Sequence, residues 1–240
     1  MVGPRLLLSM LVKNEADRYL RRVLVRHSRV VDHVLIVDDG STDDTVATCE
    51  QILKYGGRSV PYTIVQNSES KFYREHTVRR QQWEIALSLR PDWMLVLDAD
   101  ELLDSRFDSA VDAMLEQSTT NAFYLRLYDM WSETHYRDDA LWSAHKTYRP
   151  FLVRPSAWAG PWTWRESDQH CGRFPLEASH LSYACHDVRL QHLGWAKEED
   201  RKAKYERYRL LDPQGVHGSM LQYESILDPD PHLVRWNDSE

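Results

Sequence analysis

The stretch "WMLVLDADELLD", residues 93–104, constrains most strongly what this chain can fold into. Its four apolar residues, Met94 to Leu97, are followed within four positions by three acids, Asp98, Asp100 and Glu101. A short continuous apolar run predicts a strand that is buried on both faces. Carboxylates cannot stay charged inside an apolar core without partners, so we expect this strand to open into a cleft where the acids meet a cation.

The composition fits a soluble globular protein. With 240 residues, 42% of them hydrophobic and 28% charged, the chain can form one large α/β domain or two small ones. The net charge of −7 argues against a nucleic-acid binder that relies on a diffuse basic surface. It leaves room for a local basic pocket that binds a phosphate.

The cysteines and the hydropathy pattern indicate a cellular location. Cys49, Cys171 and Cys185 show no CxxC spacing, so neither a disulfide framework nor a structural zinc site is predicted. No stretch approaches the ~20 apolar residues of a membrane span, and no signal-peptide cleavage site is recognised near the N-terminus. We therefore expect a cytoplasmic protein without a transmembrane segment, in which peripheral membrane contact remains open.

Apolar runs alternate with helical patterns through the first half of the chain. We predict strands at 5–12, 32–39, 61–67 and 92–98, and helices at 15–28, 42–56 and 74–89. The second helix is expected to follow a capping residue at Ser41 or Thr42 and to end at Gly56. This succession predicts an α/β fold with a mostly parallel central sheet and helices on both faces.

The second half of the chain is rich in loops and aromatic residues. A further strand is predicted at 122–131, and six of the nine tryptophans lie between residues 131 and 195: Trp131, Trp142, Trp158, Trp162, Trp164 and Trp195. One interpretation places these rings in an aromatic core, and the other makes them a platform for sugar rings. The sequence alone leaves both open.

Polar residues follow three of the predicted strands. Ligands of open α/β sheets bind beyond the carboxyl ends of the strands. Any single acid there has the alternative role of a helix cap, but three such strand ends together predict one site. The residues are Lys13, Asn14 and Glu15 after the first strand, Asp38 and Asp39 after the second, and Asp98 and Asp100 after the fourth.

Two other classes of enzyme that bind nucleotides or phosphates also place acids after strands, and the motifs can be compared with both. A Rossmann dehydrogenase needs Gly-x-Gly-x-x-Gly after its first strand, and "LVKNEADR" contains no glycine, which excludes that class. An aspartyl-phosphate phosphatase would carry its Asp-x-Asp pair after the first strand, whereas here the pair follows the fourth. It stays a remote alternative.

The motifs "LLSMLVKNEADRYLRRVL", "VDHVLIVDDGSTDDT" and "DWMLVLDADE", in this order and spacing, resemble the family 2 glycosyltransferases of the GT-A fold. The resemblance is specific over about the first 105 residues and continues more loosely to "LQHLGWAKEEDRKAKYERY". It implies a GT-A-like, Rossmann-type sandwich. Residues 1–105 would bind the nucleotide sugar, residues 106–215 would bind the acceptor and catalyse, and residues 216–240 would be a C-terminal extension.

The resemblance also implies an activity. Such enzymes transfer a sugar from a nucleotide diphosphate donor, usually a UDP-sugar, to a hydroxyl acceptor such as a glycan, with inversion at the anomeric carbon. A Mn²⁺ or Mg²⁺ ion held by hard carboxylate oxygens neutralises the diphosphate. In the DXD motif, Asp100 corresponds to the direct metal ligand and Asp98 to the ribose contact or a second metal contact. His192 corresponds to a histidine that reaches the metal or the diphosphate.

Further residues correspond to the family's donor site. Asp39 matches the residue that reads the uracil ring, and a carboxylate can accept the N3–H of uracil. Ser9, Met10 and Val12 would flank the base, with Glu15 close by. Arg74 and Arg79 are candidates for a phosphate or base contact, with a solvated helix face as the alternative.

The catalytic base is expected in "WTWRESDQHCGRFP", which contains Glu166, Asp168 and His170. The family's use of an acid favours Asp168, and the other two stay open. Two other functions remain as alternatives. A sugar nucleotidyltransferase would normally show a Gly-rich, basic segment after its first strand, which is missing here. A non-catalytic nucleotide-sugar or glycan-binding module would keep the fold without turnover.

Overall fold

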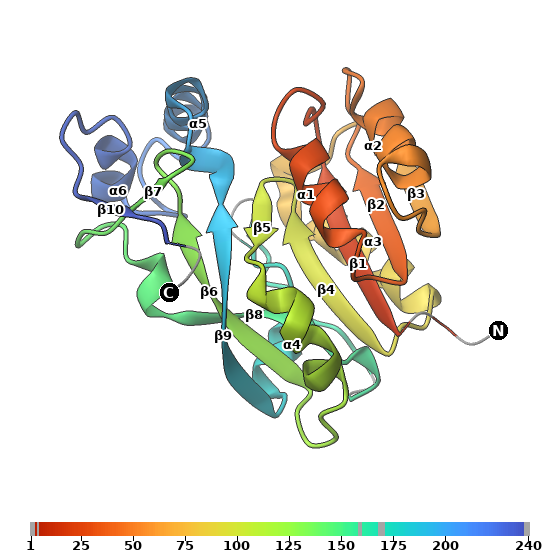
Figure 1. Ribbon diagram of the computed structural model, residues 1–240. Coiled ribbons are helices and arrows are strands. Elements are labelled where there is room, and N and C mark those ends of the chain that lie inside the picture. The colour runs from red at the N-terminus through yellow and green to blue at the C-terminus, as the bar shows by residue number, and fades with distance from the viewer. Residues whose placement is uncertain (1–2, 4, 158–159, 168–170, 238–240) are drawn as a thin grey trace. The chain divides into compact units, whose positions relative to one another are not determined.

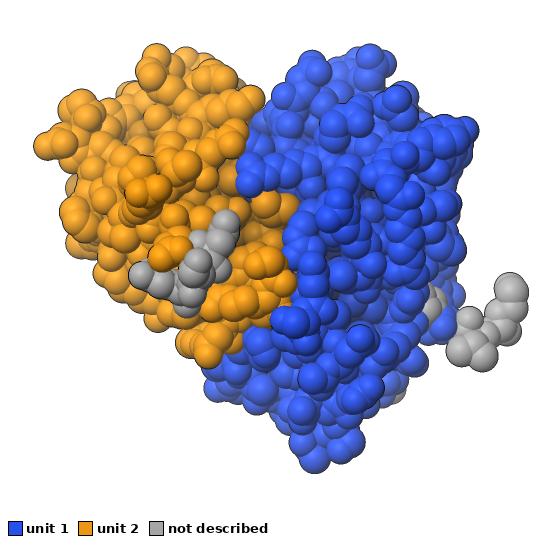
Figure 2. Space-filling model, in the orientation of Figure 1, with its two compact units in different colours: residues 1–100, 107–124, 150–186 blue, residues 101–106, 125–149, 187–240 orange. Residues whose placement is uncertain are grey.

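The computed structural model describes residues 3, 5–157, 160–167 and 171–237. The chain forms two compact units (Figure 2): unit 1 comprises residues 1–100, 107–124 and 150–186, and unit 2 comprises residues 101–106, 125–149 and 187–240. Each unit combines three separate stretches of chain. The segments 1–105, 106–215 and 216–240 expected from the resemblance divide the chain by function, and this division stays a prediction.

A parallel sheet forms the centre of unit 1. The strands β3 (Tyr62–Gln66), β2 (His33–Asp38), β1 (Leu6–Val12) and β4 (Trp93–Asp98) lie side by side in this order, and all three pairings are parallel. The connecting helices are α1 (Leu20–His27), α2 (Thr45–Tyr55) and α3 (Glu75–Ser88). The predicted α/β alternation is thus confirmed over the first hundred residues.

Helices cover both faces of this sheet. Helices α1 and α2 lie on one face and α3 lies on the other (Figure 1), as right-handed crossovers require when the strand order reverses direction at β4. Side chains alternate along a strand, so Leu7 and Leu11 of β1 face α3, where they belong to the same core as Val78 and Trp83. Every residue of β1 is buried, which explains its continuous apolar sequence.

Helix α1 begins at Leu20, later than the predicted Glu15. The residues before it bond to a neighbouring loop: Asn14 has φ +54°, and the backbone N–H groups of Asn14, Glu15 and Ala16 donate to side chains of residues 41–45. One of the acceptors is Ser41, a residue predicted to cap α2. The N-cap position of α2 is held by Asp44, while Ser41 and Thr42 bond to Asp38 and Asn14, so the capping prediction was wrong.

Antiparallel strands extend the sheet of unit 1. β8 (Tyr148–Val153) pairs antiparallel with β4, and the order continues to the first parts of β6 (Ala122–Asp129) and β9 (Tyr183–His192). Helix α4 (Arg106–Leu115) lies beside α1, where Asp108 pairs with Arg26 at 2.6 Å. The remaining helical turns of unit 1 are η1 (Phe72–Arg74), η3 (Pro155–Ala157) and η4 (Leu176–His180).

Unit 2 is built around the later parts of β6 and β9. β5 (Glu101–Leu103) pairs antiparallel with β9, and β7 (His135–Arg137) pairs antiparallel with β10 (Leu233–Arg235). The helices are α5 (Glu198–Leu211) and α6 (Met220–Ser225), with the short turns η2 (Ala144–Lys146) and η5 (Leu193–Trp195). No helix in the described part of the chain combines the length and apolar character that a membrane crossing requires.

The described tryptophans of the second half belong to packed cores. Trp131, Trp142 and Trp195 form one buried cluster with Ile226 in unit 2. Trp164 is buried in the core of unit 1, and Trp162 is half-buried against the same core. For these five rings the structure favours the core interpretation over the sugar platform. Trp158 lies outside the described residues.

Candidate active site

The carboxyl ends of the parallel strands meet at one edge of the sheet in unit 1. Asp38 is aligned with Val12 on one side and with Gln66 on the other, and Asp98 is aligned with Leu11. The acids predicted at the ends of β2 and β4 therefore follow strands that both pair with β1. This alignment confirms that the three predicted strand ends converge.

Asp98 is held by two arginines. Arg79 Nη2 donates a hydrogen bond to Asp98 Oδ1 at 2.9 Å, and Arg173 Nη2 lies 3.8 Å from Asp98 Oδ2. Burial alone would raise the pKa of Asp98, but the positive charges of Arg79 and Arg173 lower it below the usual value. Asp98 thus stays ionised at the edge of the sheet.

Asp100 is a second carboxylate in the same place. It is buried, and its negative charge acts on Asp98 in the direction that raises the pKa of Asp98, so the two carboxylates lie within electrostatic reach of each other. Among the described residues no three His, Cys, Asp or Glu side chains are grouped as a protein-only metal cage. A Mg²⁺ or Mn²⁺ ion that shares substrate phosphates needs only one or two carboxylates, and this pair fits that requirement.

Asp39 fixes the segment that follows β3. Its Oδ1 accepts a hydrogen bond from Asn67 Nδ2 at 3.0 Å. Its Oδ2 accepts bonds from Ser70 Oγ at 2.7 Å and from the backbone N–H groups of Lys71 and Phe72 at 2.8 and 3.0 Å. The residue is fully buried under this segment. Oδ2 is therefore saturated by the chain itself, whereas Oδ1 accepts one of these four bonds.

Gly40 allows this close packing. Its φ is +73°, and a Cβ at this position would lie 3.0 Å from the backbone nitrogen of Ser70. A larger residue would push the 67–72 segment away from Asp39. The glycine of "VDDGS" is thus explained by the approach of a neighbouring loop.

The polar residues after β1 are bound to the same loops. Lys13 Nζ donates to Ser70 Oγ at 2.6 Å, which links β1 to the Asp39 network. Glu15 accepts a hydrogen bond from Arg18 at 2.8 Å. The strand residues Ser9, Met10 and Val12, predicted to flank a base, all have buried side chains.

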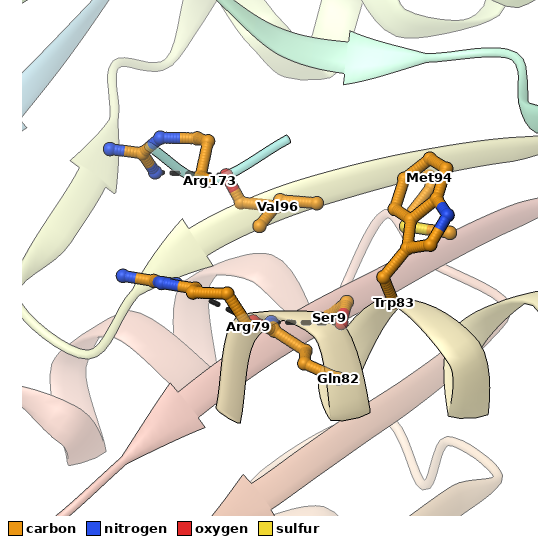
Figure 3. Close-up of a pocket in the computed structure, with 7 residues that line it drawn as sticks. All are labelled: Ser9, Arg79, Gln82, Trp83, Met94, Val96 and Arg173. Carbon is orange, nitrogen blue, oxygen red and sulfur yellow. Dashed lines mark hydrogen bonds between the residues drawn. The ribbon is translucent and has the colours of Figure 1, made fainter. Parts of the chain in front are cut away.

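A narrow pocket lies between α3 and the strands β1 and β4 (Figure 3). It leaves no room for a water molecule, and Arg79, Gln82, Arg173 and Ser9 supply its polar lining. Arg79 is buried and also bonds to Glu75. Burial alone would lower the pKa of Arg79, but the charges of Asp98 and Glu75 raise it above its usual value, so it is a permanent cation.

Three of the other predicted site residues lie in the described part of the chain. Arg74 and Glu166 are exposed in unit 1, and Asp168 and His170 lie outside the described residues. His192 ends β9 in unit 2, where its Nδ1 lies 2.8 Å from Asp129 Oδ1. That contact fixes the orientation of the imidazole ring.

Sequence reasoning missed Arg173, Asn67 and Ser70. Arg173 donates to the carbonyl of Val96 and lies over the ring of Phe151. It belongs to the segment 162–175, for which only candidates for a catalytic base were predicted. Asn67 and Ser70 follow β3, the one early strand end for which no polar site was predicted. The general rule that sites form at strand ends would have identified these two residues.

The parallel α/β sheet with acids clustered at its carboxyl edge agrees with the GT-A-like fold expected from the sequence. The chain belongs to glycosyl transferase family 2, whose family model matches residues 9–164.

Comparisons with individual proteins agree with this fold. The uncharacterized proteins Rv3786c of Mycobacterium tuberculosis and Mb3815c of Mycobacterium bovis are each 23% identical over 239 residues, which cover 92% of this chain and 54% of theirs. The chain thus spans about half the length of these curated relatives. TarS of S. aureus superimposes with a TM-score of 0.55 at 14% identity, covering 93% of this chain and 42% of that one. TarS 1-349 in complex with UDP superimposes with a TM-score of 0.53 at 14% identity, covering 93% of this chain and 69% of that one.

Proposed function

We propose that this chain transfers a sugar from a nucleotide diphosphate donor, a UDP-sugar, to a hydroxyl acceptor such as a glycan. The transfer depends on Mn²⁺ or Mg²⁺ and inverts the anomeric carbon. The observation that carries this proposal is the pair Asp98 and Asp100 at the carboxyl edge of the parallel sheet, where Asp98 is aligned with Leu11 of β1 and Asp38 with the next residue, Val12. Membership of glycosyl transferase family 2 supports the type of reaction.

The choice of UDP rests on two further observations. TarS 1-349, which shares the fold, was solved in complex with UDP. In addition, the resemblance matches Asp39 to the residue that reads the uracil ring, and its Oδ1, which accepts one bond from Asn67, is the oxygen that would accept the N3–H of uracil.

Each residue of the site has a proposed role. Asp100 would hold the metal ion, with Asp98 beside it, and the ion would supply the positive charge that the leaving diphosphate needs. Arg79 and Arg173 keep Asp98 ionised. His192, oriented by Asp129, is a candidate contact for the metal or the diphosphate. Inversion by a single displacement requires one base, for which Glu166, Asp168 and His170 are the candidates.

The proposal is tested by calorimetric titration of the protein with UDP, with and without Mn²⁺. We expect UDP to bind with Mn²⁺ and much more weakly after chelation, and UDP-sugars to be consumed when acceptors are supplied. Metal-dependent binding without turnover on any acceptor would favour a non-catalytic binding module. Release of inorganic pyrophosphate from a nucleoside triphosphate and a sugar phosphate would instead identify a nucleotidyltransferase.

Replacing Asp39 by asparagine should weaken the binding of UDP more than the binding of inorganic pyrophosphate. The carboxylate accepts the N3–H of the base, whereas an asparagine can turn its NH₂ toward the same proton donor. A hydrogen bond to a charged group contributes about 1.5–3 kcal/mol, so UDP affinity should fall roughly 10- to 100-fold. Calorimetry with both ligands measures the difference.

Ser70→Ala is the matched control for this variant. It removes one donor to Asp39 Oδ2 and loosens the same segment, but it leaves the carboxylate in place. We expect it to affect both ligands similarly. Equal losses of UDP and pyrophosphate affinity in Asp39→Asn would argue against a base contact.

A further inference from the structure

A buried series of hydrogen bonds runs from β1 through α3 to the acid cluster. Ser9 Oγ accepts a bond from Gln82 Nε2 at 3.0 Å, and Gln82 Oε1 accepts one from Arg79 Nη1 at 3.4 Å. Arg79 Nη2 then donates to Asp98 Oδ1 at 2.9 Å. Figure 3 shows the Ser9, Gln82 and Arg79 part of this series along α3. The carboxylate of Asp98 is thus connected to the rigid centre of the sheet.

Arg79 is held by the protein on several sides. Its side chain is 8% exposed, and its Nε donates to Glu75 Oε1 at 3.3 Å, one turn earlier in α3. The next residue in the helix behaves differently: the side chain of Arg80 is 64% exposed and pairs with Glu84 on the helix surface. Three hydrogen bonds to side chains of its own chain fix the Arg79 guanidinium, so it is suited to hold another group in place.

We propose that Arg79 is a positioning residue that acts on the donor through Asp98 and makes no direct contact with it. This inference rests on the proposed function. Because Arg79 fixes Oδ1, the carboxylate cannot rotate freely, and Oδ2 keeps one direction, on the side of Arg173. A carboxylate that is already oriented does not have to be ordered when the donor and its metal bind, which favours binding.

The test is a double-mutant cycle on UDP affinity in the presence of Mn²⁺. Arg79→Gln should lower the affinity roughly 10- to 100-fold, as removal of a group that orients a metal-binding residue typically does. In the Asp98→Asn background the same substitution should change the affinity by less than about twofold, because the group through which Arg79 acts is already altered. Arg79→Lys, which keeps the charge, should recover part of the loss, and Arg80→Gln should bind UDP like the unmodified protein.

The outcomes separate this inference from the function it rests on. Equal losses from Arg79→Gln in both backgrounds would show that Arg79 acts independently of Asp98 and would overturn the inference. Unchanged affinity in Arg79→Gln would do the same, while the proposed function would stand. Failure of the unmodified protein to bind UDP with Mn²⁺ would overturn both. If circular dichroism shows that Arg79→Gln does not fold, Arg79→Lys takes its place in the cycle, and the same comparison decides.

Discussion

Replacing Asp100 by asparagine should abolish the Mn²⁺-dependent part of UDP binding. The substitution keeps the size of the side chain but removes the negative charge that a hard divalent cation requires. Metal-derived charge stabilisation amounts to several kcal/mol, so the metal-dependent gain in affinity and the rate of sugar transfer should each fall on the order of a hundredfold or more. Titration with UDP at several Mn²⁺ concentrations measures the first quantity, and the rate of UDP release measures the second.

Asp92→Asn is the matched control for Asp100→Asn. Asp92 is an exposed acid immediately before β4, at the opposite end of the same strand, so its replacement removes the same charge away from the acid cluster. We expect it to bind UDP and Mn²⁺ normally. If Asp100→Asn keeps its full metal-dependent affinity while the protein is folded, Asp100 does not hold the metal.

The parallel sheet and its acid edge could be predicted because both depend on local sequence. Strands buried on both faces must be continuously apolar, and the runs ending at Val12, Asp38 and Asp98 satisfy this rule. Right-handed connections between parallel strands then place their carboxyl ends together. Convergence of the strand ends therefore followed from the order of elements, without knowledge of any tertiary contact.

The partners of the acids could not be predicted, because they come from distant parts of the chain. Asp98 is paired with Arg79, from α3, and with Arg173, from the segment 162–175, for which only a catalytic base was predicted. The sequence indicated only that Asp98 needs a cation, and a metal ion was the cation expected. In the structure two arginines also face Asp98, so part of the positive charge that it needs comes from the protein itself.

The largest effect on turnover with the least effect on binding is expected at the catalytic base. A single displacement with inversion needs a group that takes the proton of the acceptor hydroxyl as the anomeric bond breaks. The segment "WTWRESDQHCGRFP" supplies Glu166, Asp168 and His170, and the resemblance to the family favours Asp168. Glu166 is exposed, which is compatible with access to an acceptor.

Asp168→Asn should lower the rate of sugar transfer roughly a hundredfold or more, the usual contribution of a general base, while UDP affinity with Mn²⁺ stays unchanged. Glu166→Gln and His170→Ala serve as comparisons, because only the variant that lacks the base should separate turnover from binding in this way. Normal turnover in Asp168→Asn would exclude Asp168, and a loss confined to one of the other two variants would assign the base to that residue.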